Sequence, residues 1–217
     1  MTPATQPRTV TTREDVARAA LELADTEGVD ALSMRRLAGA LGVGTMTLYG
    51  YFRNKTDLLD GLVDVAMDEA EDLRTDGPWR DSLRDTVITA RRNILRHPAL
   101  VELRFRRPVL RPEALRFAEA IMVILTGAGM PRDEAARAFR LIFTFLFGYA
   151  ALSPAGAEEP ARQAARSALA ALPPERYPAL TVAVDEAAAA MGGEETFAFC
   201  LDLILDGIEA RLAEGDG

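Results

Sequence analysis

The sequence predicts an all-α protein in which a three-helix N-terminal domain is followed by a larger, C-terminal helical domain. Apolar residues recur three and four positions apart in successive stretches of the chain, which is the spacing of one face of an α-helix. Many of the 16 glycines and 12 prolines fall between these stretches, where such residues end or interrupt helices. We place the two domains at residues 1–54 and 55–217.

Composition limits the class of protein. A chain of 217 residues that is 49% hydrophobic can bury a core, and its single Cys200 excludes an internal disulfide. We find no N-terminal apolar signal and no span of twenty apolar residues, so we expect a protein of the reducing cytoplasm. The net charge of −8 argues against a protein that coats nucleic acid by bulk electrostatics. Residues 1–56 carry seven basic and six acidic side chains, so the negative charge lies in the rest of the chain.

The first two helices have recognisable ends. The segment from Thr11 to Glu14 predicts a capping box, in which a threonine oxygen accepts a free amide and Glu14 reaches back. Apolar residues at helical spacing follow, and Gly28 is expected to end this helix. Ser33 then predicts the cap of the second helix, with Leu32 able to pack on Leu37.

The next stretch is the most informative in the chain. The second helix is predicted to end at Leu41 and to turn at Gly42, because glycine tolerates the left-handed conformation that closes helices. A third, short helix would bury Leu48 and Phe52. This leaves small polar and large side chains on its outer face, namely Thr45, Met46, Thr47, Tyr49 and Tyr51. Two short helices joined by such a turn are what a helix-turn-helix needs to enter a DNA major groove, although an ordinary helical hairpin fits the same pattern.

A fourth helix is predicted to start at Asn54, which can cap it, with Asp57 at its third position. Lys55 is the only lysine of the chain and lies in the first turn, beside unpaired backbone amides. Both features favour an anion, so we expect a DNA phosphate there, with a plain solvated lysine as the alternative.

Further apolar stripes predict helices from Trp79 to His97 and from about Leu115 to Gly127, with a shorter segment between them. Residues 153–175 are rich in proline and alanine and predict either a loop or a loosely packed helix. We expect one short helix over residues 178–191.

Two helices, around residues 132–152 and 195–212, are apolar on more than one side. The apolar run of residues 141–152 is too short to span a bilayer, so protein must cover it. Self-association of two copies through these helices, as a four-helix packing, is the economical solution. The sequence indicates no membrane partner and calls for no cofactor.

The N-terminal pattern resembles that of TetR-family transcriptional repressors. The resemblance covers about residues 11–73 and rests on residues 19–24, on the run from Gly28 to Ala38, and on four further groups: Leu41-Gly-Val43, Leu48-Tyr49, Tyr51-Phe52 and Lys55. The C-terminal two thirds are similar to the ligand-binding half of members close to the tetracycline repressor. The resemblance implies an all-helical homodimer that binds a palindromic double-stranded operator and releases it when a small molecule enters the C-terminal domain.

The resemblance also implies which residues contact DNA. Thr12, Arg13 and Lys55 would contact phosphates, and Met46 would approach a thymine methyl group. The implied set comprises Thr12, Arg13, Ser33, Arg35, Thr45, Met46, Thr47, Tyr49, Tyr51 and Lys55. Gly50 departs from the family pattern, since a larger side chain is common there, so the operator sequence does not transfer from a relative.

The effector side carries less information. His97 is the only histidine, so a metal-chelated ligand is not expected, and His97 either contacts the ligand or interacts with free carbonyls at the end of its helix. Aromatic residues and a methionine could line an apolar pocket or simply form core: Phe105, Phe117, Met122, Phe139, Phe143 and Phe147.

Three readings therefore stand. The first is a ligand-responsive DNA-binding repressor without enzymatic activity. The second is a helical enzyme or small-molecule carrier, against which the sequence shows no phosphate-binding glycine loop, no metal-ligand spacing and no nucleophile with a base nearby in sequence. The third is a regulator without an effector, whose C-terminal half only dimerises.

Overall fold

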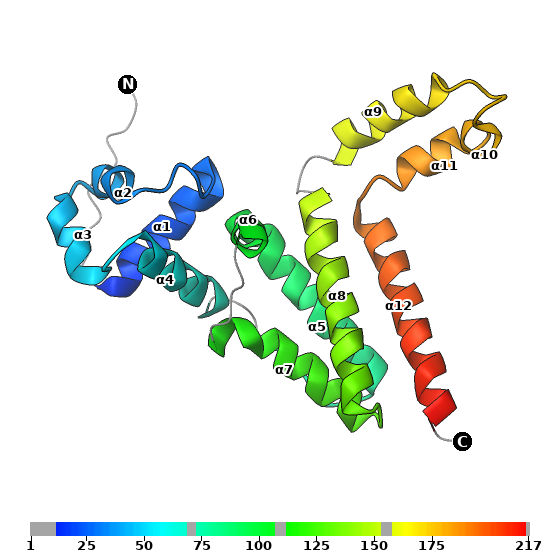
Figure 1. Ribbon diagram of the computed structural model, residues 1–217, viewed down its shortest axis with the longest axis horizontal. Helices are drawn as coiled ribbons and strands as arrows, with labels where there is room; N and C mark the ends of the chain where they lie inside the picture. Colours follow the sequence, from blue (N-terminus) through cyan, green and yellow to red (C-terminus); the bar gives the residue numbers. More distant parts are fainter. Residues whose placement is uncertain (1–11, 69–72, 107–111, 153–157, 216–217) are drawn as a thin grey trace. The chain divides into compact units, whose positions relative to one another are not determined.

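The computed structural model describes residues 12–68, 73–106, 112–152 and 158–215, and every regular element in these ranges is a helix (Figure 1). The all-α prediction is therefore confirmed. The chain forms two compact units, the first comprising Met1–Asp72 and Arg92–Phe117, the second Leu73–Arg91 and Ala118–Gly217. Helices α5 (Trp79–Arg96) and α7 (Pro112–Gly127) each contribute residues to both units.

The first unit contains helices α1 (Arg13–Glu27), α2 (Met34–Leu41), α3 (Thr45–Tyr51), α4 (Lys55–Asp68) and α6 (Pro98–Arg106). Helix α4 packs against α1, and α6 packs there as well. The predicted burial of Leu48 and Phe52 is confirmed, and both belong to one buried core with residues of the first two helices, including Val16, Leu23, Leu37 and Leu41. Removing these side chains from water is the main stabilisation of such a small domain.

Helix ends in this unit follow from capping chemistry. Gly28 has φ 83° and Gly42 has φ 68°, so both adopt the backbone region that glycine enters at little cost. The side chain of Ser33 accepts a hydrogen bond from the amide of Arg36, as predicted for a cap.

The predicted capping box is displaced by one residue. Thr12 caps α1, its side chain accepting the Asp15 amide at 3.0 Å while the Asp15 carboxylate accepts the Thr12 amide. The box needs the acid at the third helical position, which Asp15 occupies once the helix starts at Arg13. Glu14 instead pairs with Arg18, one turn along the helix.

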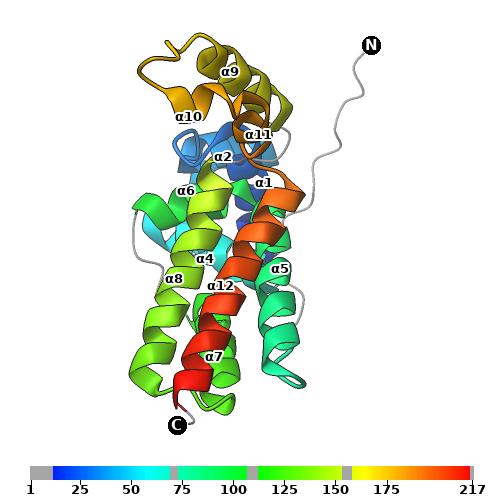
Figure 2. The same cartoon turned by 90° about the vertical axis from the view of Figure 1, so that its right-hand side faces the viewer.

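The second unit is built around two long helices, α8 (Arg132–Leu152) and α12 (Glu194–Gly215), which run side by side (Figure 2). Helix α5 is tied to α12 by three arginines. Arg80 pairs with Asp206 and Glu209, Arg84 with Asp202, and Arg91 with Glu194. Because these pairs are partly exposed, each contributes little to stability.

A helical excursion separates α8 from α12. Residues 158–170 form helix α9 (Glu158–Ala170) with no buried residue, so the loosely packed helix is the correct alternative for this segment. The prediction of one helix over residues 178–191 is wrong, since α10 (Pro178–Thr181) and α11 (Val184–Ala189) are separate. Ala183 leaves the helical region at φ −120° and ψ 30°, and this break lets α11 pack on α9.

Helix α8 spans the predicted residues 132–152, and its apolar character extends beyond the run of residues 141–152. Across the described residues it is the single helix long and apolar enough, by length and composition alone, to cross a membrane. Core helices of water-soluble proteins pass the same test, and α8 packs along α12. Only 22% of its apolar window is buried within one chain, so this helix needs additional protein cover.

Candidate functional site

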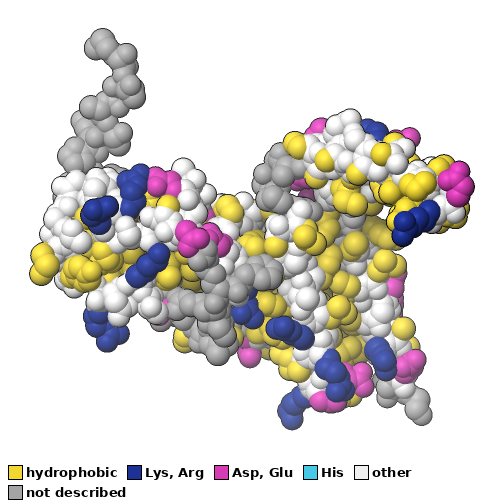
Figure 3. Space-filling model, turned by 45° about the horizontal axis from the view of Figure 1, so that its top comes forward, with side chains coloured by type: hydrophobic (Ala, Val, Ile, Leu, Met, Phe, Trp, Pro, Cys, Tyr) yellow, Lys and Arg dark blue, Asp and Glu magenta, His cyan; other side chains and the backbone are white. Residues whose placement is uncertain are grey.

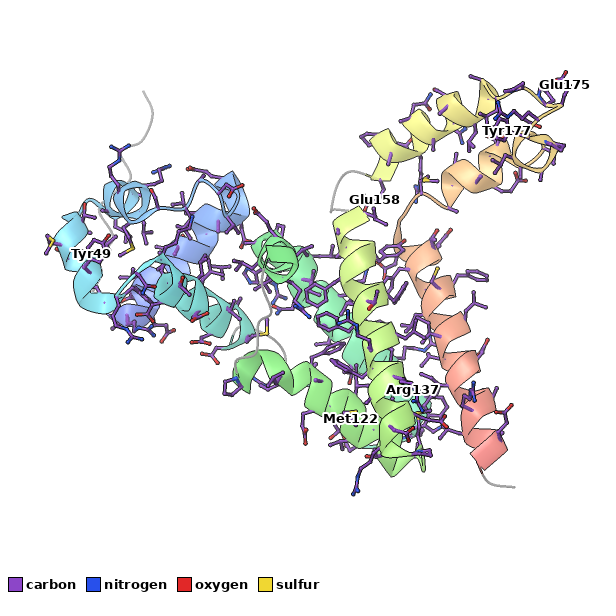
Figure 4. The ribbon with its side chains drawn as sticks, viewed as in Figure 1. Tyr49, Met122, Arg137, Glu158, Glu175 and Tyr177 are labelled. Atoms are coloured by element: carbon purple, nitrogen blue, oxygen red, sulfur yellow. The ribbon has the colours of Figure 1, made fainter. Side chains whose placement is uncertain are left out.

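Helix α3 presents one face to the core and the other to solvent. Leu48 and Phe52 are fully buried, whereas Met46 is 81% exposed and Tyr49 is 47% exposed. Thr47 is also exposed, and Figure 4 labels Tyr49 on this helix. A short helix held by buried leucine and phenylalanine thus displays a methionine, a threonine and a tyrosine outward, as a groove-reading helix requires.

Two members of the predicted outer face lie deeper. Thr45 is partly buried, and Tyr51 packs partly against the core of the first unit. The expectation that Tyr51 points freely outward is therefore wrong, because it sits at the end of α3, where the chain turns inward to bury Phe52.

The N-cap and first turn of α2 contain both engaged and exposed polar residues. The Ser33 oxygen is engaged by the Arg36 amide, and Arg36 pairs with Glu27, which raises the pKa of the Arg36 guanidinium. Arg35 is exposed beside them. Arg35 is thus solvent-accessible, and its contact with DNA stays a prediction.

Arg13 is held inside the domain. Its Nη2 donates to Asp57 Oδ1 at 2.7 Å, its Nε donates to the carbonyl of Tyr51 at 3.2 Å, and its guanidinium lies 4.3 Å from the centre of the Phe52 ring. This arginine thereby connects the start of α1 to the last residue of α3 and to the first turn of α4. Its role as a phosphate contact, like that of Thr12, stays a prediction.

Sequence reasoning missed one candidate, Arg53. Its side chain is 89% exposed, and it lies between α3 and α4, two residues before Lys55. The sequence could have indicated Arg53, because it lies close to Lys55 in the turn that was predicted to bind phosphate. Figure 3 shows basic, acidic and hydrophobic side chains on one face of the molecule.

Asp57 makes the acid stability of this unit testable. The hydrogen bond from the Arg53 amide is the largest cause that holds the Asp57 pKa below its usual value, and the charges of Arg13 and Arg53 act in the same direction. A carboxyl whose pKa is lower in the folded state contributes stability above its unfolded pKa of about 3.9, and this contribution is lost as the pH falls through the folded pKa.

We therefore expect Asp57→Asn to lower the free energy of unfolding at pH 7 and to flatten its decline below about pH 5. Urea unfolding followed by circular dichroism at a series of pH values measures both effects. Asp68→Asn, at an exposed position of the same helix, is the matched control. An unchanged acid limb in the Asp57 variant would contradict this assignment.

Lys55 lies at the start of α4, whose cap is confirmed by the Asn54 side chain accepting the Asp57 amide at 2.9 Å. The Lys55 side chain is exposed, and its Nζ donates to the carbonyl of Val29 at 3.3 Å. An ammonium carries three donors, so this bond leaves others for an anion. Lys55 is therefore exposed to solvent but also anchored by its hydrogen bond to the Val29 carbonyl.

On the second unit, α8 carries two aromatic faces. The rings of Phe139, Phe143 and Phe147 follow one another along the helix, with centroids 5.8 and 4.5 Å apart. A second group joins Phe145 and Tyr149 to Phe197 of α12 at 5.0 and 5.2 Å. The structure therefore brings three predicted ligand residues together and uses the other aromatic face as core.

The remaining predicted ligand residues are more dispersed. Met122, labelled in Figure 4, and Phe117 are half-buried on α7. Phe105 lies on α6, and its side chain falls outside the described residues. His97 is buried in the first unit with its Nδ1 2.9 Å from Asp25 Oδ2. Neither alternative weighed for His97 included this partner, which is 72 residues away in sequence. Within the described ranges, no three potential metal ligands gather.

The outer side of the α8–α12 pair is apolar. Leu141, Phe199 and Leu203 are 54%, 63% and 56% exposed, and we call these three residues the α8–α12 patch. A groove of about 630 Å³ between the two helices adjoins it, lined in part by Arg137, which Figure 4 labels near the start of α8, and by Leu203. Exposed leucines and a phenylalanine together mark an interaction surface.

Comparison with known proteins agrees with this arrangement. Residues 16–62 match the family model described as bacterial regulatory proteins, tetR family, and residues 73–212 match the tetracyclin repressor-like C-terminal domain. The chain is 31% identical to the HTH-type transcriptional repressor DrrR1 of Streptomyces coeruleorubidus, covering 99% of this chain and 83% of that protein.

Solved structures give the same picture. Apo ActR from Streptomyces coelicolor has a TM-score of 0.78 with 28% identity, covering 97% of this chain and 99% of that one. ActR in complex with actinorhodin has a TM-score of 0.76 with 27% identity, covering 94% and 99%.

Proposed function

Because the chain belongs to the TetR family of bacterial regulatory proteins, we propose that it is a ligand-responsive transcriptional repressor that binds a palindromic operator as a homodimer. The observation that carries the DNA-binding part is the outward face of α3, where Met46, Thr47 and Tyr49 are exposed above a fully buried anchor. Arg35 and Lys55 flank this face as candidates for phosphate or groove-edge contacts.

The α8–α12 patch supports the dimer. A single chain leaves its apolar residues in water, and a second copy presenting the same patch about a two-fold axis would bury both. Each dimer then carries two α3 helices. A palindromic operator matches that symmetry, since each half-site receives one helix.

The effector is proposed to be apolar and aromatic. Phe139, Phe143 and Phe147 form a row of aromatic rings along α8, an apolar surface that suits an aromatic ligand. The related ActR has been solved with actinorhodin and with (S)-DNPA. Phe105, Phe117 and Met122 complete the proposed set, while the proposal does not rest on His97, which is engaged by Asp25.

In this proposal the protein acts in the cytoplasm, where the DNA is, and catalyses no reaction. A regulator without an effector remains the second candidate, favoured if none of a panel of apolar aromatic compounds alters DNA binding. An enzyme would be revealed by turnover of such a compound.

A mobility-shift assay with the DNA upstream of the protein's own gene tests the proposal. At about 150 mM salt we expect a complex that persists against excess unrelated duplex, because specific binding in such proteins exceeds non-specific binding by about 10³-fold or more. Equal loss of the complex to any competitor would contradict sequence-specific binding.

Met46→Ala tests the reading face. We expect operator affinity to fall by roughly 30- to 10⁴-fold, because the dimer loses one base contact of about 1–3 kcal/mol in each half-site, with non-specific binding unchanged. The melting temperature should stay the same because the side chain is 81% exposed. Met191→Ala, another exposed methionine, is the matched control, and equal effects of the two variants on operator affinity would exclude this role.

A further inference from the structure

The backbone of Val29 links helix α6 to the lysine at the start of α4. The Val29 N–H donates to Glu102 Oε2 of α6 at 2.8 Å, and the Val29 carbonyl accepts from Lys55 Nζ at 3.3 Å. Both hydrogen bonds are partly buried, which strengthens a bond to a charged group relative to one in open water. The backbone of Val29 therefore binds a carboxylate through its N–H and an ammonium through its carbonyl.

Val29 is a stiff connector. Its side chain is 2% exposed in the core of the first unit, and the preceding Gly28 turns the chain with φ 83°. Because the side chain is packed, the directions of both backbone groups are fixed. A shift of the Val29 amide is thus transmitted to its carbonyl.

Helix α6 is fastened to α1 at a second point. Asp25 Oδ1 accepts the Ala99 amide in the first turn of α6 at 3.0 Å, and Asp25 Oδ2 lies 2.9 Å from His97 Nδ1. Glu102 lies one turn farther along the same helix. Two anchors a turn apart set the rotation of α6, and so aim the Glu102 carboxylate at Val29.

We propose that Glu102 is a positioning residue for DNA binding: through the two backbone groups of Val29, it holds the Lys55 ammonium where a phosphate of the operator is bound. Glu102 itself touches no DNA. This inference rests on the proposed function, in which Lys55 contacts a phosphate.

The test is a double-mutant cycle between Glu102 and Lys55, with fluorescence anisotropy on the duplex recovered from the upstream DNA at several salt concentrations. Glu102→Ala is expected to weaken binding by about tenfold or more, the typical effect of one hydrogen bond to a charged group. Lys55→Ala is expected to weaken it and to lower the salt slope by about two, because the dimer loses one phosphate contact in each half-site. In the Lys55→Ala background, Glu102→Ala should cause no further loss.

Rescue distinguishes positioning from folding. Glu102→Gln keeps an oxygen acceptor for the Val29 amide and should retain operator affinity within about twofold. If Glu102→Ala does not fold, Glu102→Asp, whose carboxylate is one methylene shorter, takes its place in the cycle. Glu119→Ala, at an exposed position of α7, is the control for loss of a carboxylate.

The outcomes separate the inference from the proposed function. Additive losses in the cycle, or a Glu102→Ala protein with wild-type affinity and salt slope, would overturn the positioning role while leaving operator binding intact. A wild-type protein that does not prefer the operator duplex would instead remove the proposed function itself.

Discussion

Replacing Phe199 and Leu203 together with aspartate is expected to convert the dimer to monomers and to weaken operator binding by about 10²–10⁴-fold. Both side chains are more than half exposed on α12, so the single chain should fold without them. In a dimer, each would place a charge against the same patch of the partner, where desolvation opposes association. A monomer binds one half-site at a time, so operator binding loses the high effective concentration that the second α3 helix of a dimer has at the second half-site.

Sedimentation velocity and anisotropy measure the two parts of this prediction. Val182→Asp, at an 84% exposed position of the excursion between α8 and α12, is the control for adding a surface charge to an apolar site. A double variant that still sediments as a dimer would show that the α8–α12 patch is not the interface. A monomer that binds the operator as tightly as the wild type would refute the bivalent account.

Phe52→Ala is expected to lower the free energy of unfolding by about 3–5 kcal/mol, the usual cost of removing a buried phenylalanine. Its ring is fully buried between helices, with the Arg13 guanidinium 4.3 Å from its centre. A Cβ added to Gly61 of α4 would lie 2.7 Å from the same ring, so α4 approaches it as closely as glycine allows. The variant loses this packing and leaves a cavity at the junction of α1, α3 and α4.

Chemical unfolding with a local probe on the first unit measures this loss. Tyr49→Ala, on the exposed face of α3, should leave the free energy of unfolding nearly unchanged while weakening operator binding. A loss below about 1 kcal/mol for Phe52→Ala would mean that the ring is not the anchor of α3.

The first four helices were predictable because local chemistry marks their ends. Gly28 and Gly42 take positive φ, and Ser33 and Asn54 cap the helices that follow them, all as their residue types favour. Periodicity then assigned Leu48 and Phe52 to the core. The one-residue error at Thr12 arose because two threonines and two acids in succession allow two registers of the same box.

Contacts between residues distant in sequence could not be predicted in this way. His97 meets Asp25, Arg13 meets Asp57, and Glu102 meets Val29 across 72, 44 and 73 positions. The spacing of apolar residues predicts which face of a helix is buried. It does not predict which polar groups from distant parts of the chain will bond to that helix. The break between α10 and α11 was missed for a related reason, since it serves the packing of α11 on α9.

The most direct test of DNA reading by α3 is photo-crosslinking from position 46. A photoreactive amino acid in place of Met46 should crosslink to bases at two symmetric places in the operator duplex, one for each protomer, and far less to a scrambled duplex. The same amino acid at Glu119 should give no crosslink. Absence of crosslinks from position 46 in a complex that still forms on the operator would contradict insertion of this face into the major groove.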